Sequence, residues 1–107
     1  MIKTGFIVFV LLVFSGCSSY VQISEITSKP REYQDKQVVI KGRVVETLEI
    51  PFVHKGMYQI EDDTDKIWVV PRKRVPFRGD KVIVKGEVKT AFAIGSRTFG
   101  TVIVEKE

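Results

Sequence analysis

The sequence predicts an all-β domain in which five antiparallel strands close into a barrel after one short helical turn. Its 107 residues allow one small domain. Residues 36–47, "KQVVIKGRVVET", recur almost unchanged at 81–90 as "KVIVKGEVKT", and both stretches alternate apolar and polar residues as strands do. Five strand-like runs follow one helical stretch, and closing them into a barrel removes the exposed edges of the sheet.

Composition narrows the classes of function. The chain is 44% hydrophobic and 28% charged, as folded proteins are, and its net charge of +4 permits an anionic partner without requiring one. The single cysteine, Cys17, excludes an intrachain disulfide and a site built from several thiolates. Because His54 is the only histidine and no nucleophile motif is present, we expect no enzymatic activity and no metal or small-molecule cofactor.

Residues 1–16 have the layout of a signal peptide. Lys3 supplies a positive start, and residues 4–16 carry no charge. This uncharged stretch is shorter than the roughly 20 residues that a helix needs to span a bilayer. The small residues Ser15 and Gly16 stand directly before Cys17. The segment therefore predicts export, with cleavage or anchoring near the cysteine.

The stretch "FSGC" at 14–17 resembles the lipobox of bacterial lipoproteins, with Phe14 where that family prefers an aliphatic residue. The resemblance implies that Cys17 carries a diacylglycerol on its sulfur and an acyl chain on its new amino terminus, and that residues 17–22 form the lipidated tether. Several acyl chains anchor a protein stably, so we expect a membrane protein of the bacterial cell envelope. Ser18 in place of Asp implies the outer membrane, facing the periplasm, in a Gram-negative cell. An ordinary secretory signal and an uncleaved anchor are the alternatives.

The folded part begins with "ISEITSKP" at 23–30. Ile23 and Ile26 have helical spacing, Ser24 is a candidate cap and Pro30 a stop, which predicts one or two helical turns. Beyond it, runs rich in β-branched residues alternate with turn residues. The predicted strands are 38–50, 56–62, 66–71, 81–92 and 98–105.

Alternation assigns faces to the two repeated strands. The inner face carries two matching sets of residues. These are Val38, Ile40, Gly42 and Val44 in the first strand, and Val82, Val84, Gly86 and Val88 in the fourth. A glycine inside a strand weakens it unless the strand must bend there, so we expect two neighbouring strands that bend at one corner of the barrel. A short duplication without structural meaning is the alternative.

The succession "VVIKGRVVE", "MYQIEDDTDKIWVV", "FRGDKVIVKGEVKT" and a last strand resembles the five-stranded oligonucleotide/oligosaccharide-binding (OB) fold. The lead-in "ISEITSKPREYQDKQ" is similar to that of small bacterial OB domains related to the tRNA-anticodon-binding type. The resemblance implies a Greek-key OB-fold barrel over residues 23–107. It also implies a ligand face on strands two and three, framed by the loops between strands one and two and between strands four and five.

The resemblance places a candidate site on that face. If Tyr58 and Ile60 point inward, Met57, Gln59 and Glu61 face the ligand. If Ile67 and Val69 point inward on strand three, as the family's pattern implies, Trp68 and Val70 face outward, and Trp68 would stack on bases or sugars. A tryptophan in the core or at the end of the barrel is the alternative.

The framing loops add aromatic and cationic side chains, which suit single-stranded nucleic acid through stacking and phosphate neutralisation. They are Phe52, His54 and Lys55 in "IPFVHKG", and Phe92 and Arg97 in "AFAIGSR". The alternative is that Phe52 and Phe92 close the ends of the barrel.

Two charged stretches complete the candidates. "PRKRVPFRGDK" at 71–81 holds Arg72, Lys73 and Arg74, which either contact phosphates or anionic lipid or form a solvated loop. "EDDTD" at 61–65 crowds oxygen ligands as a calcium site does, but its spacing fits no EF-hand loop, and a turn stabilised by aspartate side chains explains it without metal.

Two functions are consistent with these features. The first is a membrane-anchored OB-fold module that binds single-stranded nucleic acid or another extended polyanion. The second is an envelope lipoprotein that docks a protein or a glycan and has no role with nucleic acid. Steep salt dependence distinguishes phosphate binding from apolar docking, whereas the oligomeric state is not predicted by any feature of the sequence.

Overall fold

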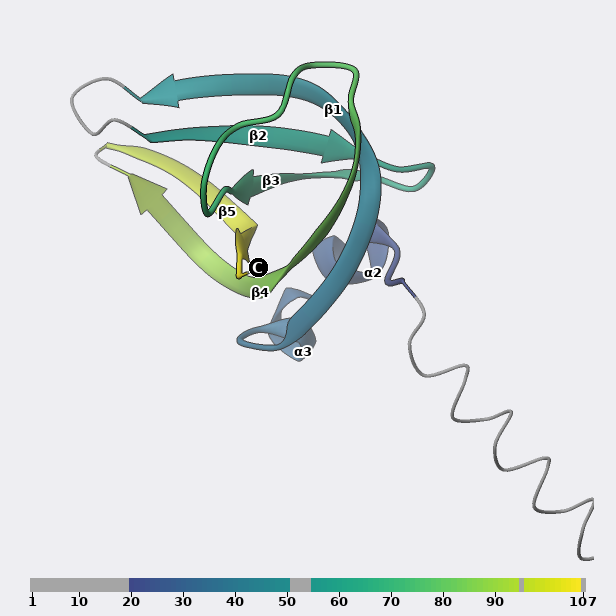
Figure 1. The fold of residues 1–107 in the computed structure, drawn as a ribbon. Helices are drawn as coiled ribbons and strands as arrows, with labels where there is room; N and C mark the ends of the chain where they lie inside the picture. Colours follow the sequence, from purple (N-terminus) through teal and green to yellow (C-terminus); the bar gives the residue numbers. More distant parts are fainter. Residues whose placement is uncertain (1–19, 51–54, 95, 107) are drawn as a thin grey trace, which may run out of the picture.

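The computed structural model describes residues 20–50, 55–94 and 96–106. Two short helices precede five strands, and Figure 1 shows the strands wrapped around a common interior. The helices are α2 (Ile23–Ser28) and α3 (Pro30–Tyr33), and the strands are β1 (Gln37–Ile50), β2 (Lys55–Glu61), β3 (Lys66–Val70), β4 (Lys81–Ile94) and β5 (Arg97–Glu105). The predicted strands are confirmed to within two residues at each end.

The five strands form one sheet that closes in a ring in the order β1-β2-β3-β5-β4, with β4 paired back onto β1. The expectation that all pairs are antiparallel is wrong for one of them. Residues 68–70 of β3 run parallel to residues 102–104 of β5. The reason is parity, because directions that alternate around a ring of five strands must repeat once.

The two longest strands each serve two neighbours. In β1, residues 37–43 pair with β4 and residues 43–50 pair with β2, with an irregular register after Val44. In β4, residues 81–87 pair with β1 and residues 86–94 pair with β5. The two glycines of the repeated phrase, Gly42 and Gly86, stand where each strand changes partner.

Close approach of two backbones explains both glycines. A Cβ on Gly42 would lie 2.5 Å from the carbonyl oxygen of Glu61 in β2, and a Cβ on Gly86 would lie 2.5 Å from that of Val104 in β5. The expectation of a single corner is wrong. Because β1 and β4 are antiparallel, Gly42 lies opposite Val82 and Gly86 opposite Val38, so the ring bends at two corners, one at each end of the shared pairing.

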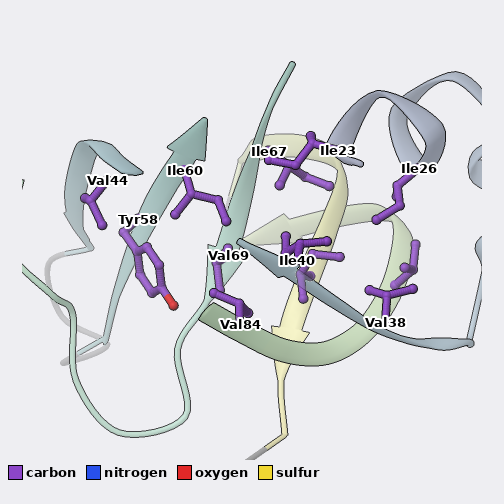
Figure 2. Packing of buried hydrophobic residues seen from close by; sticks show 12 residues of the cluster. Ile23, Ile26, Val38, Ile40, Val44, Tyr58, Ile60, Ile67, Val69 and Val84 are labelled. Atoms are coloured by element: carbon purple, nitrogen blue, oxygen red, sulfur yellow. The ribbon is translucent and has the colours of Figure 1, made fainter. Parts of the chain in front are cut away.

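The interior of the ring is filled by one cluster of aliphatic residues, and the predicted inner face is confirmed by the burial of Ile40, Val44, Val84 and Val88. In Figure 2, Val44 and Tyr58 lie on one side of this cluster and Ile26 and Val38 on the other.

Among the buried residues of the described part of the chain, only Tyr58 has an ionisable side chain, and it is 2% exposed. Burial raises the pKa of its phenol above the usual range, and the negative charge of Glu105 adds to the shift.

The two helices close one end of the interior. Ile23 and Ile26 of α2 are fully buried in the cluster, as their spacing predicts. Pro30 ends α2 but also begins a second helix, α3, because proline suits the first turn of a helix. The predicted cap, Ser24, is wrong: the residue lies inside α2, and the Ile23 N–H instead donates to Asp62 of the β2–β3 turn at 2.9 Å.

Gly42→Ala and Gly86→Ala should each destabilise the protein, because the added methyl group meets a carbonyl oxygen that the sheet holds in place. We expect a loss of about 1–3 kcal/mol in the free energy of unfolding, the usual cost of overpacking. Urea denaturation measures it. Lys85→Ala, at an exposed position beside Gly86, is the control and should change stability by less than about 0.5 kcal/mol. Equal effects in all three variants would contradict the close-approach explanation.

Candidate functional site: an aromatic and cationic face on β3 and β5

The outward face of β2, β3 and β5 carries Trp68 at its centre. Its neighbours along β3, Ile67 and Val69, are buried inside the ring, so Trp68 points outward as predicted and is partly exposed. The pairing of the strands sets Gln59 of β2 on one side of Trp68 and Val102 of β5 on the other. Trp68 and Gln59, which the resemblance assigned to one face, are therefore neighbours.

A second apolar layer lies beneath this face. Met57 and Val102 are fully buried, yet neither belongs to the interior cluster. The expectation that Met57 faces a ligand is wrong. Met57 is paired across the strands with Leu48, which is half-buried, and side chains opposite one another in a sheet lie in contact. Met57 thus belongs to the buried apolar layer beneath the outward face, whereas the Gln59 side chain is partly exposed to solvent on that face.

Trp68 belongs to a stack of aromatic and cationic groups. The ring of Phe99 meets Trp68 edge to face, with 5.7 Å between centroids and 69° between planes. The guanidinium of Arg97 lies over the other aromatic ring, 5.1 Å from the Phe99 centroid. Arg97 and Phe99 come from the start of β5, so the stack joins two strands that are far apart in the sequence.

Phe99 is a residue that the sequence analysis missed. It stands between two predicted site residues, Trp68 and Arg97, and contacts both. An aromatic residue two positions after Arg97 in a predicted strand was the available signal. Its meaning depends on the pairing of β3 with β5, which alternation along single strands does not reveal.

The remaining predicted loop residues are placed only in part. Phe92 is partly buried, and its register partner is Gly100, the residue after Phe99. Figure 1 shows the β1–β2 and β4–β5 strand pairs extending to the same side of the ring. Lys55 opens β2, paired with Ile50. Phe52 and His54, like Cys17, lie outside the described residues.

The basic stretch stands apart from the stack. The Arg72 N–H donates to Glu105 Oε1 at 3.0 Å, and its guanidinium donates to the Lys106 carbonyl at 2.6 Å. These bonds hold Arg72 at the end of β5, whereas Arg97 stands at its beginning. Lys73 and Arg74 are exposed in the connection that follows β3.

The "EDDTD" turn is held by aspartate side chains, as one of the two interpretations predicts. Asp62 Oδ1 accepts from the Thr64 hydroxyl at 2.6 Å and from the backbone N–H groups of Thr64 and Asp65, and Oδ2 accepts from Ile23. Thr27 of α2 donates its hydroxyl to Asp65 at 2.6 Å. Within the described residues, no group of three or more histidine, cysteine or carboxylate side chains is arranged to hold a metal ion.

These hydrogen bonds outweigh burial at Asp62. Burial alone would raise the pKa of the carboxyl, but the bonds from Thr64, Ile23 and Asp65 to its charged form lower it below the ordinary value. The turn therefore fastens α2 to the ring, with Asp62 as the cap that α2 lacks in its own sequence.

A groove of about 520 Å³ lies where β1 changes partner. Its walls bear three cations, Lys41, Arg43 and Lys81, and three carboxylates, from Glu61 to Asp63. A smaller hollow of about 340 Å³ adjoins it and is lined by Tyr20, whose ring carries the Lys41 ammonium at 4.7 Å from its centroid. Because the two signs of charge are balanced there, the groove has no electrostatic preference for a polyanion.

No protein-family model, curated protein or solved structure matches this chain. None of the helices formed by the described residues has both the length and the apolar character needed to cross a bilayer. The site must therefore be interpreted from its own chemistry.

Asp62→Ala should lower the free energy of unfolding by about 1 kcal/mol, the usual value of a helix cap, because Ile23 and two turn residues lose their acceptor. Asp63→Ala, at an exposed position in the same turn, is the matched control with little expected effect. Since the folded pKa is depressed, the contribution is complete above about pH 5 and is lost as the pH falls through the folded value. Urea denaturation at several pH values measures it, and a difference that persists undiminished near pH 2 would contradict this account.

Proposed function

We propose that this chain is a non-enzymatic, membrane-anchored OB-fold module of the bacterial cell envelope that binds an extended polyanion, with single-stranded nucleic acid as the reference ligand. The observation that carries the proposal is the stack of Trp68, Phe99 and Arg97 on the outward face of β3 and β5. The OB fold, the ligand and the membrane anchor can each be tested without the others.

The order of the strands supports the OB-fold assignment. β1, β2 and β3 follow one another as neighbours, and β4 returns through the connection of residues 71–80 to lie beside β1. The spatial order 4-1-2-3 is that of a Greek key. OB folds bind ligands on strands two and three between the loops at one end, the region where Trp68 and Gln59 meet in register.

The chemistry of the stack supports a chain-like anionic ligand. Aromatic rings offer stacking surfaces to successive bases without regard to sequence, and a nearby guanidinium neutralises a phosphate. Trp68 and Phe99 lie at a steep angle to one another, so one ligand group would stack on Trp68 while its neighbour meets the Phe99–Arg97 pair. A single small anion would use only part of this arrangement.

A glycan ligand is the second candidate, and Gln59 favours it. The Gln59 side chain stands beside Trp68 on the partly exposed outer face, and an aromatic ring next to a neutral amide suits a sugar ring and its hydroxyl groups. In an envelope compartment sugars are common and nucleic acid is scarce. The two ligands differ in charge, so salt dependence separates them.

Fluorescence anisotropy of labelled single-stranded oligonucleotides, titrated with the segment from Ser18 to Glu107, tests the proposal. We expect saturable binding at physiological salt. Trp68→Ala should weaken it about 5- to 150-fold, since stacking contributes about 1–3 kcal/mol per base. Arg97→Gln should reduce the slope of log K against log salt by about 0.7, the value for one phosphate of a single strand.

Lys85→Gln is the control, because this exposed cation lies on β4 where that strand pairs with β1. It should leave the affinity and the salt slope close to those of the parent. Competition by heparin and duplex DNA tests specificity for single strands. Absence of binding, or weak binding that heparin abolishes equally for all variants, would end the nucleic-acid proposal and direct the search to glycans and envelope proteins.

The anchor has its own test, independent of the ligand. In the full chain, Cys17→Ala should shift the protein from the membrane fraction to the soluble fraction or leave it unprocessed with reduced electrophoretic mobility, because the acyl chains have no other attachment site. Fractionation and labelling with a fatty-acid analogue measure this. Unchanged membrane association and mobility in Cys17→Ala would refute lipidation.

A further inference from the structure

Phe77 is the most exposed large hydrophobic side chain among the described residues, with 81% of its surface accessible. It lies in the connection between β3 and β4, which crosses in front of the strands in the view of Figure 1. Val75, two residues earlier, packs against the interior cluster. The connection is thus fixed by Val75 while it presents Phe77 to solvent.

Hydrogen bonds fix the backbone of the turn that carries Phe77. The Phe77 N–H donates to Asp80 Oδ2 at 3.0 Å, and the Asp80 N–H donates to the Phe77 carbonyl at 3.1 Å. The turn that results is tied to β1, because the Gly79 N–H donates to the Val44 carbonyl at 2.8 Å and the Val44 N–H donates to the Asp80 carbonyl at 2.9 Å. Exposure of Phe77 is therefore a property of an ordered turn.

Cationic residues flank Phe77 in the sequence. Residues 71–80 contain four cations and one carboxylate, Asp80, whose oxygen already accepts the bond from Phe77. Lys73, Arg74 and Arg78 are exposed, and none of the ion pairs within the described part of the chain involves them. Arg72, by contrast, is hydrogen-bonded to Glu105 and to the Lys106 carbonyl.

The shape of this surface favours a bilayer over a protein partner. With 81% of its surface accessible, the Phe77 side chain extends into solvent and fills no pocket of its own domain. A projecting aromatic ring needs a matching pocket on a protein, whereas a lipid interface admits it without one. Aromatic residues at the headgroup level, with lysine and arginine on anionic headgroups, are the usual means of interfacial binding.

We propose that the Phe77 turn, with Lys73, Arg74 and Arg78, is a second membrane contact that inserts Phe77 into the interface of a bilayer rich in anionic lipid. This contact is separate from the aromatic stack and does not rely on the ligand bound there. It also does not rely on lipidation of Cys17, because it is formed by the folded ring itself.

The test places a fluorescent reporter at the tip of the turn. Trp68 is the only tryptophan, so the Trp68→Phe chain has no tryptophan fluorescence. Adding Phe77→Trp to this chain places a single fluorescent reporter at the proposed contact. The full chain is bound to vesicles of phosphatidylglycerol with brominated acyl chains, or of phosphatidylcholine brominated in the same way. We expect a blue shift and strong bromine quenching on the anionic vesicles, with at least a fivefold smaller effect on the zwitterionic vesicles.

Comparison at equal amounts of bound protein removes the contribution of the apolar N-terminal residues, which bind either lipid. Ile83→Trp in the same background is the matched control, because Ile83 is also exposed, at 57%, but lies on β4 beyond the turn. Its emission should not change with the lipid. Adding Lys73→Gln, Arg74→Gln and Arg78→Gln to the Phe77→Trp chain should abolish the preference for anionic lipid, since each cation near such a surface contributes about fivefold.

Quenching of Phe77→Trp equal to that of Ile83→Trp on anionic vesicles would overturn the proposal. The proposal would also be overturned if the emission of Phe77→Trp did not respond to lipid but shifted to the blue on addition of polyglutamate. That result would indicate that the turn binds acidic proteins. Circular dichroism of each variant confirms the fold, which substitution at these exposed positions should leave intact.

Discussion

The structure depends on the close approach of backbones at Gly42 and Gly86. At these two positions a strand passes so near its new neighbour that any side chain would meet a carbonyl oxygen. The approach lets β1 and β4 leave one partner and join another without a break, so five strands cover the whole circumference. The buried interior and the outward face both follow from that closure, since neither exists in an open sheet of the same strands.

Much of the fold was predictable because side chains alternate along a strand. Alternation assigned Val38 and Ile40 to the interior, and this assignment needs only the residue's own strand. It could not orient Trp68, because residues 67–70 are all apolar, and the outward direction came from the resemblance to the OB fold. Relations between strands were harder. Parity requires a parallel pair in a closed ring of five strands, but the sequence shows neither that β3 and β5 form it nor their register, and Phe99 was missed for this reason. The cap of α2 also comes from a distant turn, at Asp62.

The chemically distinctive surfaces are segregated over the ring. Stacking groups lie on β3 and β5, the mixed charges of the groove lie where β1 changes partner, and the exposed cations Lys73, Arg74 and Arg78 lie in the same connection as Phe77. If both proposals hold, segregation would let one small domain meet a ligand and a membrane without competition for the same residues. The net charge of +4 averages over these surfaces, so composition alone does not reveal them.

The parallel pair of β3 and β5 joins only residues 68–70 to residues 102–104, whereas β1 pairs with β2 and β4 over longer stretches. The ring therefore has a seam, where separation breaks the fewest hydrogen bonds. Trp68 lies on β3, on one side of this seam, and it contacts Phe99 of β5 on the other side. A ligand that stacks on both Trp68 and Phe99 would hold β3 and β5 together. Binding of the ligand would then also raise the mechanical stiffness of the closed sheet.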